Sequence, residues 1–218
     1  MKKFLLAAAL ASGVGATLAA APPGVDQLTS YFRSVQVDDV KTVERMIAGR
    51  IVNPNQPDPG SGETGLILAL REGAQRVAQA LIALPGIDLE ARAPNGNTAL
   101  MMASYKRNTA AVTALLAHGA KVNQPGWNAL HNAAASGADE IASLLLAKGA
   151  RIDARGPAGT TALMMAAKEG QESSVALLLD AGANAALVNS EGLTAAQLAE
   201  RAEKPRIAAA IRQHGKAN

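Results

Sequence analysis

The sequence contains no cysteine and very few aromatic residues. Without cysteine among its 218 residues, the chain cannot use thiol catalysis, disulfide frameworks, cysteine-based zinc fingers or iron-sulfur ligation. Aromatic residues make up only 2% of the chain, too few for the platforms on which single-stranded nucleic acids stack their bases. We therefore expect no nucleic-acid partner. Because 49% of the residues are hydrophobic, we expect an aliphatic, alanine-rich core.

An excess of one charge sign is also missing. The chain has 21 Lys and Arg against 18 Asp and Glu, a formal net charge of +3 at pH 7. Removing Lys2 and Lys3 with the N-terminal segment described below lowers this charge to +1. So small a net charge does not by itself hold nucleic acid or an anionic membrane.

The first twenty residues have the pattern of a secretory signal peptide. Lys2 and Lys3 precede an apolar run over residues 4–18, and small alanines follow at 19–21. The alternative is a membrane anchor, but the run falls short of the ~20 apolar residues that a spanning helix needs. We predict that residues 1–20 are cleaved, that no stable membrane span remains, and that the protein is periplasmic through the general secretory pathway.

The rest of the chain repeats one unit of about 33 residues. A Gly-x-Thr or Gly-x-Asn start recurs, with third residues 34, 30, 33 and 33 apart: Thr64, Thr98, Asn128, Thr161 and Thr194. A later glycine recurs with spacings of 33, 30 and 33: Gly86, Gly119, Gly149 and Gly182. Both series shorten at the same step, which places a three-residue deletion between Val122 and Asn128.

Each unit has the pattern of two short helices. Apolar residues recur at helical spacing over 129–135 and again over 140–146, and Gly137 separates the two runs. The threonines sit where a hydroxyl caps a first helix, and the later glycines sit where a second helix ends in a left-handed conformation. We predict an all-α fold, a solenoid of about six helix-turn-helix repeats with short hairpin-like fingers.

At this point the sequence resembles the ankyrin repeat family. The Thr-Pro-Leu-His signature of that family is matched in part by Asn-Ala-Leu-His at 128–131 and by Thr-Ala-Leu-Met at 98–101 and 161–164. Every proline of the signature is replaced, and four of five histidines are lost. The repeat endings at 115–123 and 145–153 follow the family closely. The resemblance covers nearly all of residues 21–218, which we predict to form one ankyrin repeat domain.

The two ends of this domain are expected to be atypical repeats. Residues 26–53 end like a repeat and are predicted to form a degenerate N-terminal cap, while the charged segment 194–213 is predicted to form the C-terminal cap. Residues 54–62, rich in Pro, Gly and Asn, fit either an irregular ordered finger or a flexible linker. The sequence alone does not decide between these two interpretations.

Catalytic chemistry has little support in the sequence. His118 and His214 precede glycines at helix ends, where an imidazole satisfies terminal carbonyls, and the resemblance implies a structural hydrogen-bonding role for His131. No serine or carboxylate lies at a spacing that defines a catalytic triad or a metal face. We predict a protein that is not an enzyme and that has no cofactor and no metal.

Binding residues are assigned by the resemblance, which implies contacts from the finger tips and the first helices. The predicted protein-binding residues are Arg71, Arg92, Tyr105, Lys106, Trp127, Arg155, Thr160, Lys168 and Arg201. Tyr, Trp and Arg dominate binding hot spots, so a basic face around Tyr105 and Trp127 is expected. The alternatives are that Trp127 covers backbone exposed by the shortened finger, and that the basic residues form a solvated face.

These observations predict a monomeric, non-catalytic interaction scaffold in the bacterial envelope that binds a protein partner through its concave face. The resemblance to periplasmic ankyrin repeat proteins implies a role in oxidative or envelope stress protection. The alternative is an inhibitor or immunity protein that blocks a periplasmic toxin or enzyme, for which a rigid basic face would suit an acidic partner.

Overall fold

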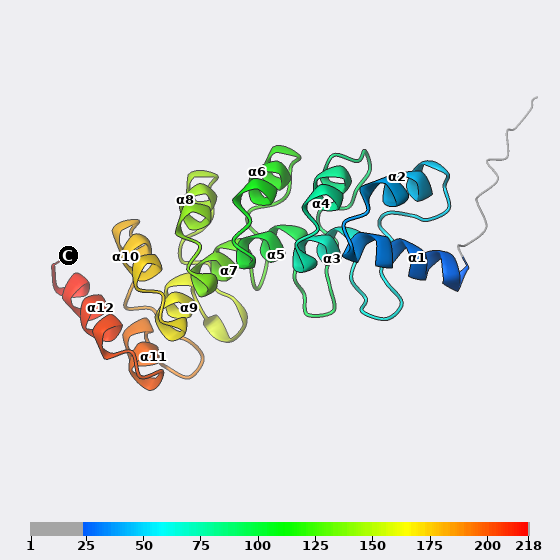
Figure 1. The fold of residues 1–218 in the computed structure, drawn as a ribbon. Coiled ribbons are helices and arrows are strands. Elements are labelled where there is room, and N and C mark those ends of the chain that lie inside the picture. The colour runs from blue at the N-terminus through cyan, green and yellow to red at the C-terminus, as the bar shows by residue number, and fades with distance from the viewer. Residues whose placement is uncertain (1–23, 218) are drawn as a thin grey trace, which may run out of the picture.

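A computed structural model describes residues 24–217 of the chain, and the predicted signal peptide lies outside these residues. The described part contains twelve α-helices, one short 3₁₀ helix η1 (Pro157–Gly159) and no strand beyond one isolated bridge between Pro57 and Thr64 (Figure 1). The α-helices are α1 (Val25–Gln36), α2 (Val40–Ala48), α3 (Gly65–Glu72), α4 (Gln75–Ile82), α5 (Ala99–Tyr105), α6 (Thr109–Ala117), α7 (Ala129–Ser136), α8 (Asp139–Ala147), α9 (Ala162–Glu169), α10 (Glu172–Asp180), α11 (Ala195–Arg201) and α12 (Pro205–Ala217). The prediction of an all-α repeat solenoid is confirmed.

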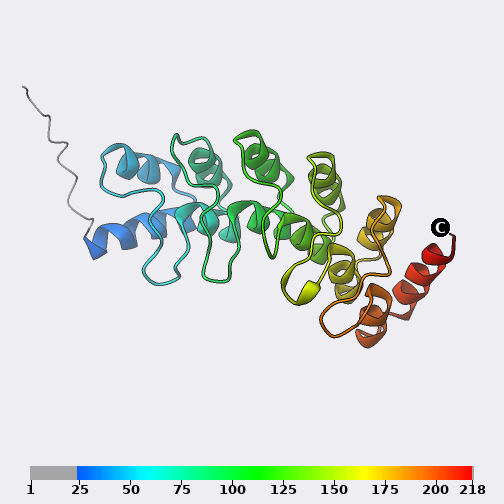
Figure 2. The same cartoon turned by 180° about the vertical axis from the view of Figure 1, so that it is seen from behind.

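The helices form two layers. The odd-numbered helices α1 to α11 pack against one another in one row, and the even-numbered helices form a second row beside it. Fingers project from the side of the first row, as both views show (Figures 1 and 2). The stack is nearly straight from α1 to α7, and its last repeats curve toward the side of the fingers.

The first helices begin where the sequence predicts. The hydroxyl oxygens of Thr64, Thr98, Thr161 and Thr194 accept hydrogen bonds of 3.3–3.5 Å from backbone N–H groups three residues later. In the remaining repeat, the side-chain amide oxygen of Asn128 accepts from the backbone N–H groups of Leu130 at 3.0 Å and His131 at 3.2 Å. Each cap satisfies an amide that has no partner within its own helix.

Hydrogen bonds also join neighbouring repeats in the segments that follow the second helices. Side-chain oxygens of Asn55, Glu90, Asn123 and Asp153 each accept a hydrogen bond of 2.8–3.0 Å from a backbone N–H of the next repeat. The donors lie two residues after the later glycine of each unit: Asp88, Lys121, Arg151 and Asn184. Gly119, Gly149 and Gly182 have φ angles of 89°, 83° and 90°, the left-handed conformation predicted for them.

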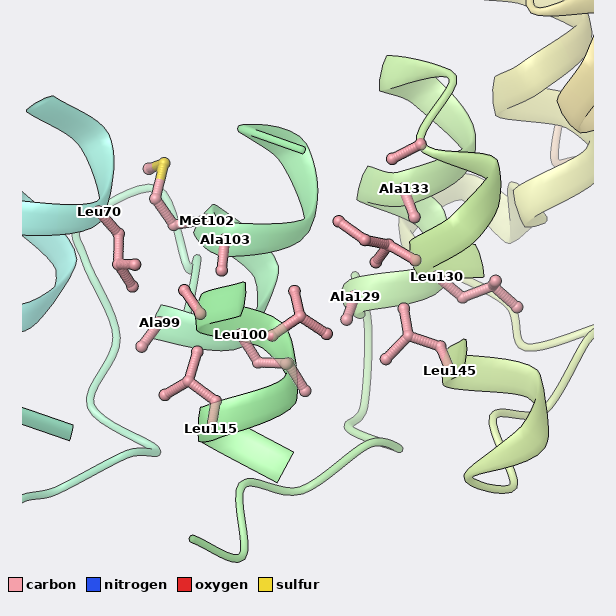
Figure 3. Packing of buried hydrophobic residues seen from close by; sticks show 14 of the residues in the cluster. Leu70, Ala99, Leu100, Met102, Ala103, Leu115, Ala129, Leu130, Ala133 and Leu145 are labelled. Atoms are coloured by element: carbon pink, nitrogen blue, oxygen red, sulfur yellow. The ribbon is translucent and has the colours of Figure 1, made fainter. Parts of the chain in front are cut away.

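The core between the layers is aliphatic, with alanines between larger side chains. Ala99, Ala103, Ala129 and Ala133 lie among leucines such as Leu100 in the centre of the stack (Figure 3). Small side chains let neighbouring helices approach closely, and leucines fill the remaining space. At the N-terminal end, Tyr31 and Phe32 of α1 are buried with their ring centroids 5.0 Å apart.

The fingers are short hairpins, and the segment 54–62 is one of them. The Asp58 amide donates to the Glu63 carbonyl at 2.8 Å, as the Ala93 amide does to Asn97 at 2.9 Å and the Gly156 amide to Thr160 at 2.8 Å. Residues 54–62 therefore form an ordered finger, one of the two alternatives that the sequence left open. The connection between α6 and α7 spans 118–128, three residues fewer than the 148–161 connection that follows, in agreement with the deletion inferred from the repeat spacing.

The terminal helices occupy the segments expected for the caps. α1 and α2 lie in the predicted N-terminal cap repeat, and α11 and α12 lie in the C-terminal one. α12 runs to Ala217, beyond the expected end at 213. The domain boundaries themselves stay predictions.

Candidate protein-binding groove

Three fingers and the first helices of the last two repeats, α9 and α11, line a groove of about 460 Å³. We call it the α9–α11 groove, and its lining residues are Trp127, Pro157, Ala158, Thr160, Met164, Met165, Lys168, Asn189, Glu191, Leu198, Arg201 and Ala202. Three fingers and two helices contribute to it. The groove brings together four of the nine predicted binding residues: Trp127, Thr160, Lys168 and Arg201.

Trp127 forms one wall of the groove and is half-buried. Its ring meets the His131 ring edge-on, with centroids 5.2 Å apart and planes at 82°. The indole also lies directly over Gly156, because a Cβ atom there would be 2.8 Å from Trp127 Cε3. The side chain thus covers finger backbone, as one reading of the short finger predicted, while the same indole lines the groove.

His131 holds the neighbouring finger in place beneath Trp127. Its side chain is buried, and Nε2 donates to the Thr160 carbonyl at 3.0 Å while Nδ1 lies 2.8 Å from the Asn128 side-chain oxygen. Burial lowers the pKa of His131 below its ordinary 6.5, against the opposing effect of the Thr160 carbonyl. The structural role expected for this histidine is confirmed.

The floor of the groove is apolar. Met164 is 1% exposed and belongs to the core, whereas Met165 of α9 and Leu198 of α11 are half-buried and line the groove. Neither Met165 nor Leu198 is among the predicted binding residues. The signal that would have found them is an apolar residue one helical turn before Lys168 and one before Arg201, on the same face of each helix.

The rim of the groove carries two cations with exposed side chains. Lys168 Nζ lies 3.9 Å from Glu169 Oε1, and Arg201 Nη1 lies 2.5 Å from Glu191 Oε2. The Lys168 and Arg201 side chains are 59% and 63% exposed. Exposed ion pairs of this kind contribute about 0–1 kcal/mol each, so a carboxylate of a partner can compete for both cations.

Arg71 lies outside the groove, in a cluster of charges on α3. Its Nη2 lies 3.1 Å from carboxylate oxygens of both Glu63 and Glu72. Glu63 is buried, and this desolvation raises the pKa of its carboxyl above the ordinary value, opposed by the nearby Arg71 charge. Two carboxylates of its own chain therefore hold Arg71.

The other predicted residues do not line the groove. Arg92 donates from Nη1 to the Gly96 carbonyl at 2.7 Å and from Nη2 to Gln124 Oε1. Arg155 donates from Nη1 to the Val188 carbonyl at 2.9 Å. Tyr105, 56% exposed, and Lys106, also exposed, end α5. The groove lining therefore includes four of the nine residues, and a binding role for all nine stays a prediction.

Residues 24–217 hold no group of three or more His, Asp or Glu side chains arranged to bind a metal ion. None of the helices in this part of the chain combines the length and the hydrophobicity required to cross a bilayer.

The architecture is that of a helical repeat solenoid with fingers. The family described as "Ankyrin repeats (3 copies)" matches the chain over residues 31–125, 66–156 and 130–218. The chain belongs to the ankyrin repeat family. Ankyrin repeats are generally protein–protein interaction modules and typically non-catalytic.

Individual proteins show the same relationship. The chain is 35% identical over 124 residues to SH3 and multiple ankyrin repeat domains protein 1 of Homo sapiens, and equally to that of Mus musculus. The match covers 55% of this chain but only 6% of the length of these relatives. The crystal structure of an ankyrin repeat domain from Acinetobacter baumannii AYE is similar, with a TM-score of 0.70, 27% identity and coverage of 85% of this chain and 97% of that one.

Proposed function

We propose that this ankyrin repeat protein binds another protein non-covalently, with the α9–α11 groove at the centre of the contact. One observation carries the proposal: Trp127, Met165 and Leu198 share a groove of about 460 Å³ with Lys168 and Arg201. Aromatic residues, Met and Arg are enriched where protein interfaces bury most of their surface, and Trp and Arg supply much of the binding energy. Tyr105 and the remaining predicted residues extend the contact toward the N-terminal repeats.

The compartment that we propose is the bacterial envelope, with the protein as a monomer. The support is the N-terminal pattern of Lys2 and Lys3, an apolar run over 4–18 and the alanines at 19–21. Oxidative or envelope stress protection is the physiological role we propose. Fractionation of cells with a C-terminally tagged chain tests the location, and a tagged protein that stays in the cytoplasm at its full mass contradicts it.

In-cell photo-crosslinking tests the binding proposal. A photoreactive residue replaces Lys168 in one variant and Ser143 in another, because Ser143 is exposed on α8 in the second row of helices, outside the groove lining. We expect a specific protein adduct from position 168 and none from position 143, with the trapped protein identified by mass spectrometry. Identical adducts from both positions, or none from 168 under any growth or stress condition, contradict the proposal.

The identity of the trapped protein separates the physiological roles. A protein of the stress defence supports stress protection, and a toxin or hydrolytic enzyme trapped through its active site supports the inhibitor role instead. Truncation of Trp127 to Ala is expected to weaken the complex with the trapped protein by about 2 kcal/mol or more if Trp127 is an anchor. Unchanged affinity of a folded Trp127→Ala variant removes Trp127 from the interface.

A further inference from the structure

The α9–α11 groove combines an apolar row and a cationic row that run side by side. Met165 and Leu198 occupy equivalent positions in successive repeats, and so do Lys168 and Arg201, because each pair lies 33 residues apart. The helices that carry them, α9 and α11, pack against each other. On each helix the cation follows the apolar residue by three positions, about 4.5 Å along the axis.

This separation lies between the distances that one and two residues of an extended peptide span. An extended chain advances about 3.3 Å per residue. If a peptide places one side chain at the apolar row, the side chain of the next residue or of the one after it can therefore reach the cationic row. The groove volume of about 460 Å³ falls within the range of about 300–1,000 Å³ that is usual for ligand pockets. Trp127 also lines the groove and offers a flat apolar ring.

The charges around the groove favour an acidic segment. The charged residues that line it are two cations, Lys168 and Arg201, and one carboxylate, Glu191. A third cation lies close by, because Arg155 donates to the carbonyl of Val188, the residue before groove-lining Asn189. The guanidinium of Arg201 has five N–H donors in a planar fork, so it can hold Glu191 and a second carboxylate together. Lys168 Nζ lies 3.9 Å from Glu169, longer than a hydrogen bond.

We infer that the groove binds an extended peptide segment of the partner in which a large apolar residue is adjacent to, or one residue removed from, Asp or Glu. The apolar side chain lies against Trp127, Met165 and Leu198, and the carboxylate meets Lys168 and Arg201. This inference rests on the proposed function and adds the chemistry of the segment that is recognised.

Selection from a random peptide library displayed on phage tests the inference with the purified full-length protein. The readout for each selected peptide is the fluorescence of Trp127, which is the only tryptophan in the chain and therefore reports on this groove alone. We expect selected peptides to combine Asp or Glu with a large apolar residue within two positions, and to bind more weakly as the salt concentration rises. Enrichment of basic peptides, or binding without any change at Trp127, overturns the inference.

Matched variants locate the contacts. The double variant Lys168→Gln, Arg201→Gln is expected to weaken a selected acidic peptide about tenfold or more, because charge-assisted hydrogen bonds are lost, and to leave its Asn or Gln analogue unaffected. Arg76→Gln, which removes an exposed arginine of α4 outside the groove lining, is the control and is expected to change neither affinity. Equal affinity of the acidic peptide for the double variant and the control variant contradicts the inference.

The two proposals can fail separately. If a partner crosslinks at position 168 in cells but its bound segment has no acidic residue beside an apolar one, the proposed function holds and this inference is wrong. If acidic-apolar peptides bind as expected but position 168 traps no protein in cells, the peptide chemistry of the groove holds and the proposed function is wrong.

Discussion

The N-terminal and C-terminal halves of the solenoid use the same helix position in different ways. The position compared is the fourth residue after the threonine that caps each first helix. In the N-terminal half this position holds Leu68 and Met102, which are 1% and 7% exposed. Met165 and Leu198 occupy the same position in α9 and α11 and are half-buried, lining the groove. The repeat pattern supplies an apolar residue in all four cases, so the pattern alone does not separate core residues from groove-lining residues.

The two halves also differ in their overall course. The stack is nearly straight over its N-terminal repeats and curves toward the finger side over its last repeats (Figure 1). The shortened finger that carries Trp127 lies where this change begins. A local deletion and a local curvature therefore coincide with the groove.

The largest expected effect is on the free energy of unfolding, which truncation of a buried leucine should lower more than truncation of a groove-lining leucine. Leu68→Ala is expected to cost about 2–5 kcal/mol of the free energy of unfolding, as buried leucines do. The Leu198 side chain is already partly exposed to solvent. Leu198→Ala is therefore expected to cost about 1 kcal/mol, close to the average loss of stability for a point mutation. Urea denaturation measures both values. Peptide affinity is expected to show the reverse order, because only Leu198 lines the groove; equal losses of stability would erase the distinction between the halves.

The next effect concerns the packing that closes the N-terminal end. Gly65 replaces the alanine found at the start of other first helices, and a Cβ atom there would lie 2.5 Å from the Tyr31 hydroxyl oxygen. Gly65→Ala is therefore expected to destabilise the protein by about 1–3 kcal/mol through overpacking, although alanine is tolerated at the equivalent Ala99. Thermal and urea unfolding measure the change.

Tyr31→Phe provides the matched control for this contact. The buried Tyr31 hydroxyl has no hydrogen-bond partner in the described residues, and burial raises the pKa of the phenol. An unsatisfied buried polar group costs about 1–3 kcal/mol, so Tyr31→Phe alone is expected to stabilise the protein. The double variant Tyr31→Phe, Gly65→Ala is expected to recover part of the loss; no recovery would show that the hydroxyl is not the clashing group.

These contacts mark the limit of what the sequence predicts. Helix starts at Thr98 and Asn128 could be predicted because a cap is a local interaction over three residues. The deletion before Asn128 followed from spacing alone. The contact between Tyr31 and Gly65 joins two repeats through side-chain shape, which no periodic pattern records. The exposure of Met165 and Leu198 depends on curvature and on fingers from other repeats, which the pattern of a single repeat does not record.

A smaller effect is expected from the pH dependence of His131, at the junction of the two halves. Because its pKa is lower in the folded protein than the ordinary 6.5, the unfolded chain binds the proton more readily as the pH falls through 6.5. The free energy of unfolding is therefore expected to fall between pH 7.5 and the folded-state pKa of His131. Denaturation series at several pH values measure the slope. His131→Gln is the control, and an identical slope in that variant would assign the effect to other groups.

The smallest effect on stability is expected from oxidation of the groove floor. Met165 is half-buried, whereas Met46, Met101, Met102 and Met164 are at most 7% exposed. Hydrogen peroxide transfers one oxygen atom to a thioether, giving a sulfoxide and water, and exposed methionines react first. Peptide mapping by mass spectrometry is therefore expected to find Met165 sulfoxide well before oxidation of the four buried methionines.

The same reaction tests what the groove is for. A polar sulfoxide in the groove that Trp127 and Leu198 also line is expected to weaken the binding of acidic-apolar peptides. The unfolding curve is expected to stay nearly unchanged, because Met165 does not belong to the buried core. The Met165→Leu variant keeps the apolar floor and cannot be oxidised there, so its affinity is expected to resist peroxide. If wild type and Met165→Leu lose affinity together, the loss arises elsewhere and Met165 is not part of the binding surface. If only the wild type loses affinity, an oxidant regulates the C-terminal groove without disturbing the N-terminal repeats that support it.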